Sequence, residues 1–301
     1  MPIASAIVCT KDRPVPIVEA VRSLLAGDDP IELIVVDQSE ANDTEDALAV
    51  WKSEPRFQYI RSRKRGKGIA LNEGIRAARG SIIVCTDDDC AVPLHWVRDM
   101  ARALESHPTA AILFCNVTPV AHDHNAGYVP SYERTRGRML RSVSALRDGL
   151  GLGAGMALRR DVALALGGFD ESFGPGARFP SADEWDISIR ALLSGWHIYE
   201  TPEISIVHDG FRTFEQGKAH AQRDWIALGA VCAKPLRAGH LGAIIIPVWM
   251  VPSKLFLPPL VDLLRLRKPR GFARIVGFFR GFAEGLATGV DPETLRFLPP
   301  P

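Results

Sequence analysis

Short runs of β-branched and other apolar residues recur along the first two thirds of the chain and alternate with amphipathic stretches. The strand-like runs lie at residues 7–10, 31–37, 57–60 and 81–86, and a later one lies at 204–207. The stretches between the first four have the spacing of apolar positions that is typical of helices. Near-continuous apolar runs are typical of strands buried on both faces. The pattern therefore predicts an α/β fold with a doubly wound, mostly parallel sheet flanked by helices.

Three consecutive acids, Asp87, Asp88 and Asp89, end the apolar run at 81–86. Carboxylates at the carboxyl end of such a strand face the crevice where open α/β sheets bind ligands. Hard oxygen ligands suit Mg²⁺ or Mn²⁺, and a magnesium site commonly combines one or two carboxylates with substrate phosphates. The acids therefore indicate a metal-bound nucleoside diphosphate. The alternative is a solvated acidic loop, or acids that only stabilise the start of the helix expected after Pro93.

Two other predicted strands also end in a polar residue, Thr10 and Asp37. The carboxyl ends of parallel strands in a doubly wound sheet meet at one edge, so three ligand-capable strand ends converge there. Such convergence is harder to obtain by chance than any single acid, and it favours a binding site over a solvated loop.

The order and spacing of several sequence blocks resemble those of the inverting glycosyltransferases of family 2, which have the GT-A fold. The matching blocks lie at residues 5–14, 35–39, 66–74, 78–80, 160 with 167–171, and 183–190, within a resemblance that covers roughly residues 3–210. The resemblance implies transfer of a sugar from a nucleoside-diphosphate sugar, with UDP preferred. The acceptor would be a hydroxyl group of a glycan or of a lipid-linked intermediate.

The resemblance assigns the metal ligands. Asp87 and Asp89 match the family's Asp-x-Asp, with Asp89 as the direct ligand of Mn²⁺ or Mg²⁺ and Asp87 facing the ribose or, through water, the metal. Asp88 is expected to point the other way if the backbone is extended there. His208 follows the run at 204–207, where the family often carries a histidine, and is the candidate third ligand. The alternative is a histidine with a purely structural hydrogen bond.

The nucleotide-sugar pocket is assigned on the same resemblance. Thr10 and Asp37 would contact the uracil or the ribose, and Arg13 would approach the base or a phosphate. Lys67 lies in a Gly-Lys-Gly sequence that could bring a cation close to the diphosphate, although a glycine-rich turn before a helix is the alternative. Asp88 is included in this donor-binding set.

The candidate catalytic base departs from the family pattern. The usual order is Glu-Asp followed by x-Asp-Leu, whereas this chain has Asp183-Glu184 before Trp185-Asp186. Alignment on Asp186 places Glu184 at the catalytic carboxylate, with Asp183 beside it. A general base requires reach to the acceptor hydroxyl and a suitable pKa, and glutamate can meet both. A competing interpretation is a capping box in which Glu184 turns back to the amide of Ser181. Glu184, Asp183 or neither is therefore the base.

Three other blocks have expected structural roles. The glycine-rich residues 151–155 would let the sugar approach the backbone, because they lack the acid that a dinucleotide fingerprint requires. Asp170 and Glu171 are expected in a turn on the acceptor side. Arg190 is expected to pair with an acid near the site.

Composition sets the outer limits. A chain of 301 residues with 47% hydrophobic residues can bury a sizeable core, and a net charge of +1 argues against a nucleic-acid partner. Five cysteines, with no paired metal spacing, predict a reducing compartment and hence the cytoplasm. Met1 stands almost directly before the first strand, which leaves no room for a signal peptide in this sequence.

The last part of the chain is both basic and apolar. Residues 234–280 carry nine Lys or Arg and one acid, Asp262. Residues 241–264 are mostly apolar, but the uncharged stretch 241–253 contains prolines and is shorter than the ~20 residues that a membrane-spanning helix needs. The composition favours a segment lying on an anionic membrane surface, on the inner face of the plasma membrane.

The alternative for this region is a helical appendage that packs on the catalytic domain or on a second subunit, with Pro258 and Pro259 in a loop. Either interpretation divides the chain into a GT-A domain at 1–215 and a helical, basic and apolar region at 216–301.

Other function classes remain open on the sequence alone. A nucleotidyltransferase shares the α/β core and metal acids, but usually has a glycine-rich loop near the amino terminus, where residues 10–14 contain no glycine. A retaining transferase of similar fold would need no base at Glu184. A non-catalytic scaffold on a membrane surface is the third alternative.

Overall fold

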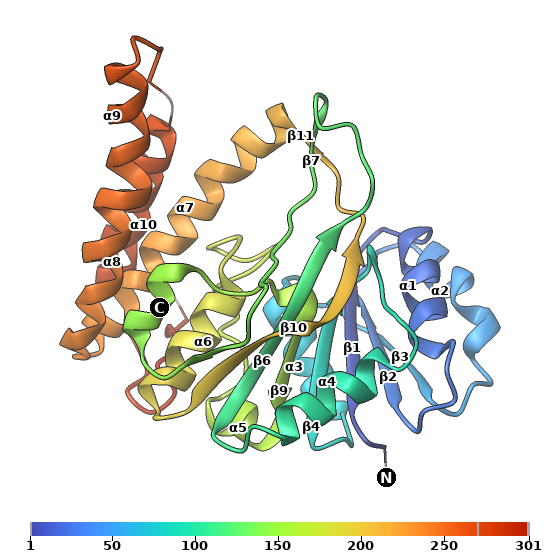
Figure 1. Ribbon diagram of the computed structural model, residues 1–301. Helices are drawn as coiled ribbons and strands as arrows, with labels where there is room; N and C mark the ends of the chain where they lie inside the picture. Colours follow the sequence, from blue (N-terminus) through green and yellow to red (C-terminus); the bar gives the residue numbers. More distant parts are fainter. Residues whose placement is uncertain (1, 270, 300–301) are drawn as a thin grey trace.

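The computed structural model describes residues 2–269 and 271–299 as a central sheet with helices on both faces and a helical carboxyl-terminal region (Figure 1). Nine strands of the described residues form the main sheet. Its path runs β3 (Phe57–Arg61), β2 (Glu32–Asp37), β1 (Ser5–Thr10), β4 (Ile82–Asp87), β9 (Met156–Arg159), β6 (Ala110–Pro119), β10 (His197–His208) and β5 (Cys90–Ala91), with β8 (Arg138–Leu140) also paired to β10. A separate pair joins β7 (Gly127–Tyr128) to β11 (Arg212–Thr213).

The predicted α/β fold is confirmed, and the parallel arrangement is strongest in the first half of the sheet. Strands β3, β2, β1 and β4 are all parallel, as is the pair β6 and β10. Strand β9 runs antiparallel between β4 and β6 and joins the two parallel groups. The second half of the sheet is therefore mixed, because β9, β5 and β8 are short antiparallel additions.

Alternating side chains of the parallel strands supply two cores, one on each face of the sheet. Ile7 and Ile34 point to one core, while Val8 and Val35 point to the other. The first core is covered by α3 (Lys67–Ala77), α5 (Arg160–Ala165), α6 (Asp183–Leu193) and the carboxyl-terminal helices, and the second by α1 (Pro16–Leu25) and α4 (Trp96–Glu105). Burial on both faces explains why these strands read as continuous apolar runs. The short helix α2 (Asp43–Ala47) lies between β2 and β3 in the chain.

The carboxyl-terminal region is helical, as predicted. It consists of α7 (Phe214–Arg237), α8 (Ile245–Met250), α9 (Leu257–Leu264) and α10 (Phe272–Ala287), with η4 (Leu241–Ile244) and η5 (Val251–Phe256) between them. Glycines let α7 and α10 pack at very close range, since a Cβ at Gly281 would lie 1.8 Å from the carbonyl oxygen of Ile226. The division of the chain after residue 215 stays a prediction.

Two expectations for this region are wrong. Pro258 and Pro259 lie within the first turn of α9, where proline is tolerated, and not in a loop. The prolines also do not interrupt the segment Leu241–Leu264, which forms one 24-residue helical run that is long and apolar enough to cross a membrane. This conclusion concerns length and composition only, and core helices of soluble proteins pass the same test.

A buried charge network fastens α7 to α6. Lys234 of α7 is 2% exposed and forms ion pairs with Asp170 and with Asp186 of α6, the former at 2.7 Å. Arg190 pairs with Asp186 at 2.8 Å, so the predicted pairing of Arg190 with an acid is present. Asp170 also accepts a hydrogen bond of 2.7 Å from the backbone amide of Phe297. Three sequence-distant segments therefore share one set of compensated charges.

We predict that Lys234→Met lowers the free energy of unfolding by about 3–5 kcal/mol, because it leaves buried carboxylates without their cation. Urea unfolding followed by circular dichroism measures the change. Lys218→Met, an exposed position on the same helix, is the matched control and should change stability by less than about 0.5 kcal/mol. A loss below about 1 kcal/mol for Lys234→Met would show that the network contributes little.

Candidate functional site

The three acids lie where the sequence places them, at the carboxyl end of β4. Asp87 is the last residue of the strand, and Asp88 and Asp89 form the turn that leads into β5. Asp88 was expected to point the other way only if the backbone were extended there, and this condition is not met: Asp88 lies in a turn, and Asp88 and Asp89 both contact Arg13. The alternation of an extended strand does not apply to residues in a turn.

Thr10 and Arg13 hold Asp88 in place. The hydroxyl of Thr10 donates a 2.7 Å hydrogen bond to Asp88, and the Arg13 guanidinium donates to Asp88 at 2.6 Å and to Asp89 at 3.0 Å. Burial raises the pKa of Asp88 to about 6, although the Thr10 hydroxyl and the Arg13 charge oppose the rise. Arg13 itself is 42% exposed at its side chain, so its charge remains accessible to a ligand.

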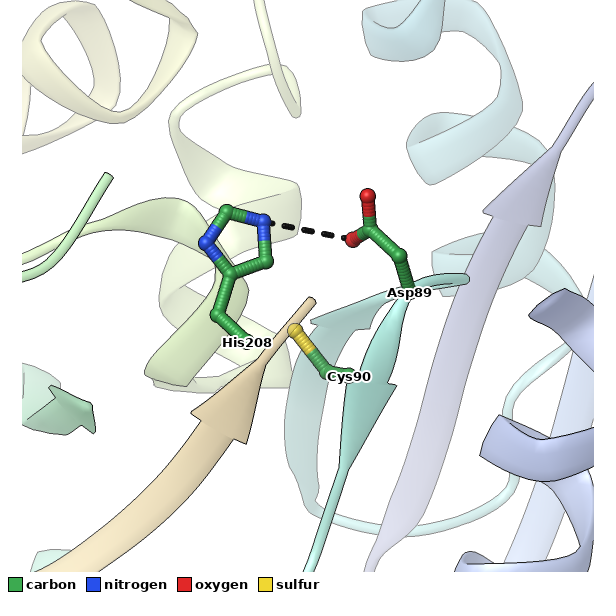
Figure 2. Close-up of side chains that lie close together, drawn as sticks. All are labelled: Asp89, Cys90 and His208. Carbon is green, nitrogen blue, oxygen red and sulfur yellow. Dashed lines mark ion pairs between the residues drawn. The ribbon is translucent and has the colours of Figure 1, made fainter. Parts of the chain in front are cut away.

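Asp89, Cys90 and His208 form a compact group of possible metal ligands (Figure 2). Their ligand atoms lie within 4.8 Å of one another, and Nε2 of His208 lies 3.3 Å from Oδ1 of Asp89. Burial alone would raise the pKa of Asp89, yet His208 and Arg13 hold it well below its usual range. Conversely, Asp89 and the Pro130 carbonyl raise the pKa of His208 although burial opposes this.

The chemistry of this group fits a divalent cation. Nδ1 of His208 lies 2.8 Å from the carbonyl oxygen of Pro130, which can only accept, so Nδ1 carries the proton. In neutral His208 the lone pair of Nε2 therefore faces Oδ1 of Asp89, a buried oxygen that receives no hydrogen bond from the described residues. Two acceptors that face each other repel, and either a proton on Nε2 or a metal ion bound between them would remove this repulsion.

Cys90 belongs to this group and Gly210 lies beside it, and both were missed by the sequence analysis. Burial, with the nearby charges of Asp87 and Asp89, raises the pKa of the Cys90 thiol, which keeps it protonated and a weak ligand. Gly210 leaves room for the imidazole, because a Cβ there would lie 2.5 Å from Nε2 of His208. No sequence signal marked either residue, since their positions depend on how β10 pairs with β5.

Lys67 connects the acid triplet to the carboxylate pair of α6. It begins α3 and forms an ion pair with Asp87. Burial by itself would lower the pKa of Lys67, but the charges of Asp87 and Asp183 raise it well above its usual range. Gly66, just before the helix, has a φ of 125°, which favours glycine in this turn.

The start of α6 presents Asp183 and Glu184 to this cation. The predicted capping box is wrong, because the helix begins after Ala182, whose φ is 65°, and no side chain of the described residues caps it. Burial and the adjacent charge of Asp183 raise the pKa of Glu184 to about 8. Gly153 lies opposite, since a Cβ there would lie 3.8 Å from the Cβ of Glu184. The carboxyl group of Glu184 thus takes no part in a capping box, and it lies near Gly153, which has no side chain.

Asp37 is fully buried at the end of β2, in register with Thr10 of β1. Its two carboxylate oxygens accept hydrogen bonds from the Tyr59 hydroxyl at 2.7 Å and from the Ser39 amide at 2.8 Å. Asp37 therefore orders the loop that follows β2. Its predicted contact with the nucleotide stays a prediction.

The fold and the order of these elements match known sugar-transferring enzymes. Residues 5–166, more than half of the chain, match the family described as Glycosyl transferase family 2. The chain belongs to this family. The glycosyltransferase interpretation is thereby confirmed, which removes the nucleotidyltransferase alternative. The GT-A fold is confirmed by the solved structures that the chain resembles.

A curated relative is a glucosyl-dolichyl phosphate glucuronosyltransferase from Haloferax volcanii, 24% identical over 201 residues. The alignment covers 62% of this chain and 62% of the relative's length.

Two solved structures share the fold over 95% of this chain. TarS from S. aureus, residues 1–349, has a TM-score of 0.61 at 15% identity and is covered over 82% of its length. The mannosyltransferase PcManGT from Pyrobaculum calidifontis, in complex with GDP-Man and Mn²⁺, has a TM-score of 0.58 at 21% identity and 86% coverage. At these identities the likeness concerns the fold.

Proposed function

We propose that this family 2 glycosyltransferase transfers a sugar, with inversion, from a nucleoside-diphosphate sugar to an acceptor hydroxyl in a metal-dependent reaction. The observation that carries the proposal is the position of Lys67. It pairs with Asp87 of the acid triplet, and the charge of Asp183 on α6 raises its pKa. A possible cation site and a possible base thus both lie near one half-buried lysine, as a displacement between a donor and an acceptor requires.

Asp89, Asp87 and His208 are the residues that would hold Mn²⁺ or Mg²⁺. A divalent cation bound there supplies charge neutralisation for the departing diphosphate. The buried acceptor pair of Asp89 and His208 supports this assignment, and the neighbour PcManGT was solved with Mn²⁺.

The donor pocket is proposed around Asp88, beside the proposed metal ligands. Thr10, Asp37 and Asp88 would orient the nucleoside, while Arg13 and Lys67 offer cationic groups to the phosphates. The neighbouring structures hold different nucleotides, GDP-Man in PcManGT and UDP in TarS, so the fold leaves the choice open. The preference for UDP rests on the sequence resemblance.

Glu184 is the proposed general base, with Asp183 as the alternative. Inversion requires one carboxylate that takes the proton from the attacking hydroxyl. Its raised pKa brings Glu184 close to neutral pH, where an effective general base ionises. Asp183 is buried, and its charge raises the pKa of Lys67. It therefore suits the role of stabilising the charge of Lys67.

The acceptor is proposed to be a glycan or lipid-linked intermediate at a cytoplasmic membrane surface. The helical segments from η4 to α10 expose a set of large apolar side chains that we call the apolar face. Its members are Leu241, Ile244, Ile245, Val248, Phe256, Leu257, Leu260, Leu263, Leu264, Phe272, Val276 and Phe279. Lys254, Arg265, Arg267 and Lys268 add positive charge beside it. Apolar and basic groups together suit an anionic bilayer surface.

We expect Asp89→Asn to fold but to lose at least tenfold in Mn²⁺-dependent UDP affinity, because the proposed direct ligand loses its charge. Titration calorimetry with UDP and with GDP, each with Mn²⁺ and with EDTA, measures both the metal and the nucleotide preference. Asp46→Asn, an exposed acid on α2, is the control. Unchanged Mn²⁺-dependent affinity in Asp89→Asn would refute the ligand assignment.

Glu184→Gln should keep donor affinity but reduce transfer by roughly 10²-fold or more, since the amide cannot accept the proton. In the wild type, the base must be ionised, so kcat/KM should rise with pH up to the raised pKa of about 8. That rise should disappear in Glu184→Gln. Asp183→Asn is the matched variant and should reduce transfer less. If only Asp183→Asn is inactive, Asp183 is the base.

The membrane proposal needs point substitutions, because Phe297 is buried and a truncation after residue 240 would remove it from the core. We expect Leu260→Gln with Leu263→Gln to weaken sedimentation with phosphatidylglycerol vesicles by about tenfold or more, since less apolar area is available for burial. Val15→Gln with Val50→Gln, exposed positions in the amino-terminal part, is the control. Wild-type protein that ignores such vesicles at low salt would favour packing on another protein.

A further inference from the structure

A cavity of about 140 Å³ lies between the short helix η2 (Val143–Asp148) and α8. Figure 1 shows the green segment that contains η2 beside α8 and α6. The lining residues are Val143, Ser144, Leu146 and Arg147 from η2, and Ile245, Ile246, Trp249 and Met250 from α8. An apolar cavity of about 150 Å³ in another protein stays dry and takes up benzene, so this one can hold a hydrocarbon unit of five or six carbons.

The cavity is continuous with the apolar face. Ile245 lines the cavity and is also 41% exposed, and Val248, one turn away on the same helix, is 57% exposed. An apolar chain that lies against α8 from a bilayer can therefore reach the cavity at Ile245. Trp249 forms one wall, and the ammonium of Lys254 lies 5.2 Å from the centre of its ring.

Positive charge is concentrated in η2 and in the segment just before it, and Arg147 lines the cavity itself. Five arginines lie between residues 134 and 147, and Arg134 and Arg138 are held by the buried Glu200, at 3.6 Å and 2.7 Å. The other three, Arg136, Arg141 and Arg147, are exposed. Within residues 2–269 and 271–299, Arg136 and Arg141 form no ion pair, and Arg147 has only a 3.8 Å contact with its neighbour Asp148.

The same segment leads directly to the proposed base. After η2 the chain passes Gly149 and reaches Gly153, which lies opposite Glu184. Gly151 is fixed on the way, because its amide donates a 3.1 Å hydrogen bond to the buried Glu200. Along the chain, the exposed Arg136 and Arg141 thus come first, the cavity-lining residues of η2 with Arg147 follow, and Gly153 beside the proposed catalytic carboxylate comes last.

We propose that the cavity binds part of the apolar chain of an anionic amphiphilic acceptor, a polyprenyl phosphate or diphosphate that carries the accepting hydroxyl on a sugar. The exposed arginines, Arg147 first among them, bind the phosphate, and the accepting hydroxyl extends toward Glu184. This proposal rests on the proposed function for the acceptor's role, but the cavity itself can be tested without transfer.

Binding is tested with farnesyl phosphate as the probe, by titration calorimetry on the full chain. Wild-type protein should bind it at least tenfold more tightly than farnesol and should show no binding of inorganic phosphate at the same concentrations. Ile245→Trp, which fills the cavity, and Arg147→Gln, which removes the cation, should each weaken binding at least tenfold. UDP affinity in Mn²⁺ should stay unchanged in both variants.

Val248→Trp is the matched control, because it adds the same side chain on α8 at an exposed position that does not line the cavity. The proposal is overturned if Ile245→Trp binds farnesyl phosphate like the wild type, or if Val248→Trp weakens binding equally. It is also overturned if phosphatidylglycerol vesicles displace the probe and Ile245→Trp weakens vesicle binding to the same degree, since the occupant is then a bilayer lipid.

The two proposals fail in different ways. If UDP does not bind in Mn²⁺ while farnesyl phosphate binds and Ile245→Trp abolishes this, the donor chemistry is wrong and the cavity assignment stands. If UDP binds and transfer to a soluble glycan proceeds, while no variant of the cavity changes farnesyl phosphate affinity, the cavity assignment is wrong and the donor chemistry stands.

Discussion

The parallel pairing of β1 with β2 and β4 is the constraint on which the candidate site depends. This register sets Thr10 beside Asp37 and Cys9 beside Asp87, so three strand ends open on one crevice. The antiparallel strand β9 then connects this group to β6 and β10, whose pairing with β5 brings His208 opposite Cys90. Residues more than a hundred positions apart therefore meet because of backbone hydrogen bonds, before any side-chain interaction contributes.

Charge compensation is the second feature of this edge. Without a ligand, Asp87 pairs with Lys67, Asp88 with Arg13, and Asp89 with both Arg13 and His208. Burying three carboxylates without such partners would be costly, since desolvation of each charge opposes folding. In the proposed function the same cations would turn to the phosphates of the donor when the acids receive a metal. The partners that stabilise the ligand-free protein are thus the groups that a nucleoside diphosphate would use.

The sequence predicted the first half of the sheet because β1, β2 and β4 are apolar on both faces and end in a polar residue, while the edge strand β3 is a short, partly buried run that contains Phe57, Tyr59 and Ile60. It did not predict β9, whose Met156–Arg159 segment is short and has no β-branched residue. The pattern of β6 was also missed, although Ala110–Pro119 is buried along most of its length. Candidate residues at strand ends, such as Asp89 and His208, were accessible to this reasoning. Gly210 and Cys90 were not, because their proximity to His208 depends on antiparallel pairing that carries no sequence signature.

The helical carboxyl-terminal region is less separate from the catalytic fold than its composition indicates. Lys234 of α7 pairs with Asp186 of α6. The same helix begins with the proposed catalytic acids Asp183 and Glu184. The glycines of α10 bring α7 close behind it, and α10 carries the part of the apolar face that Phe272, Val276 and Phe279 form. Packed elements of this kind move together, because close-packed interiors transmit displacement. A membrane contact on α8 and α9 would therefore fix the orientation of α6, and with it the direction from which a membrane-bound acceptor reaches the proposed base.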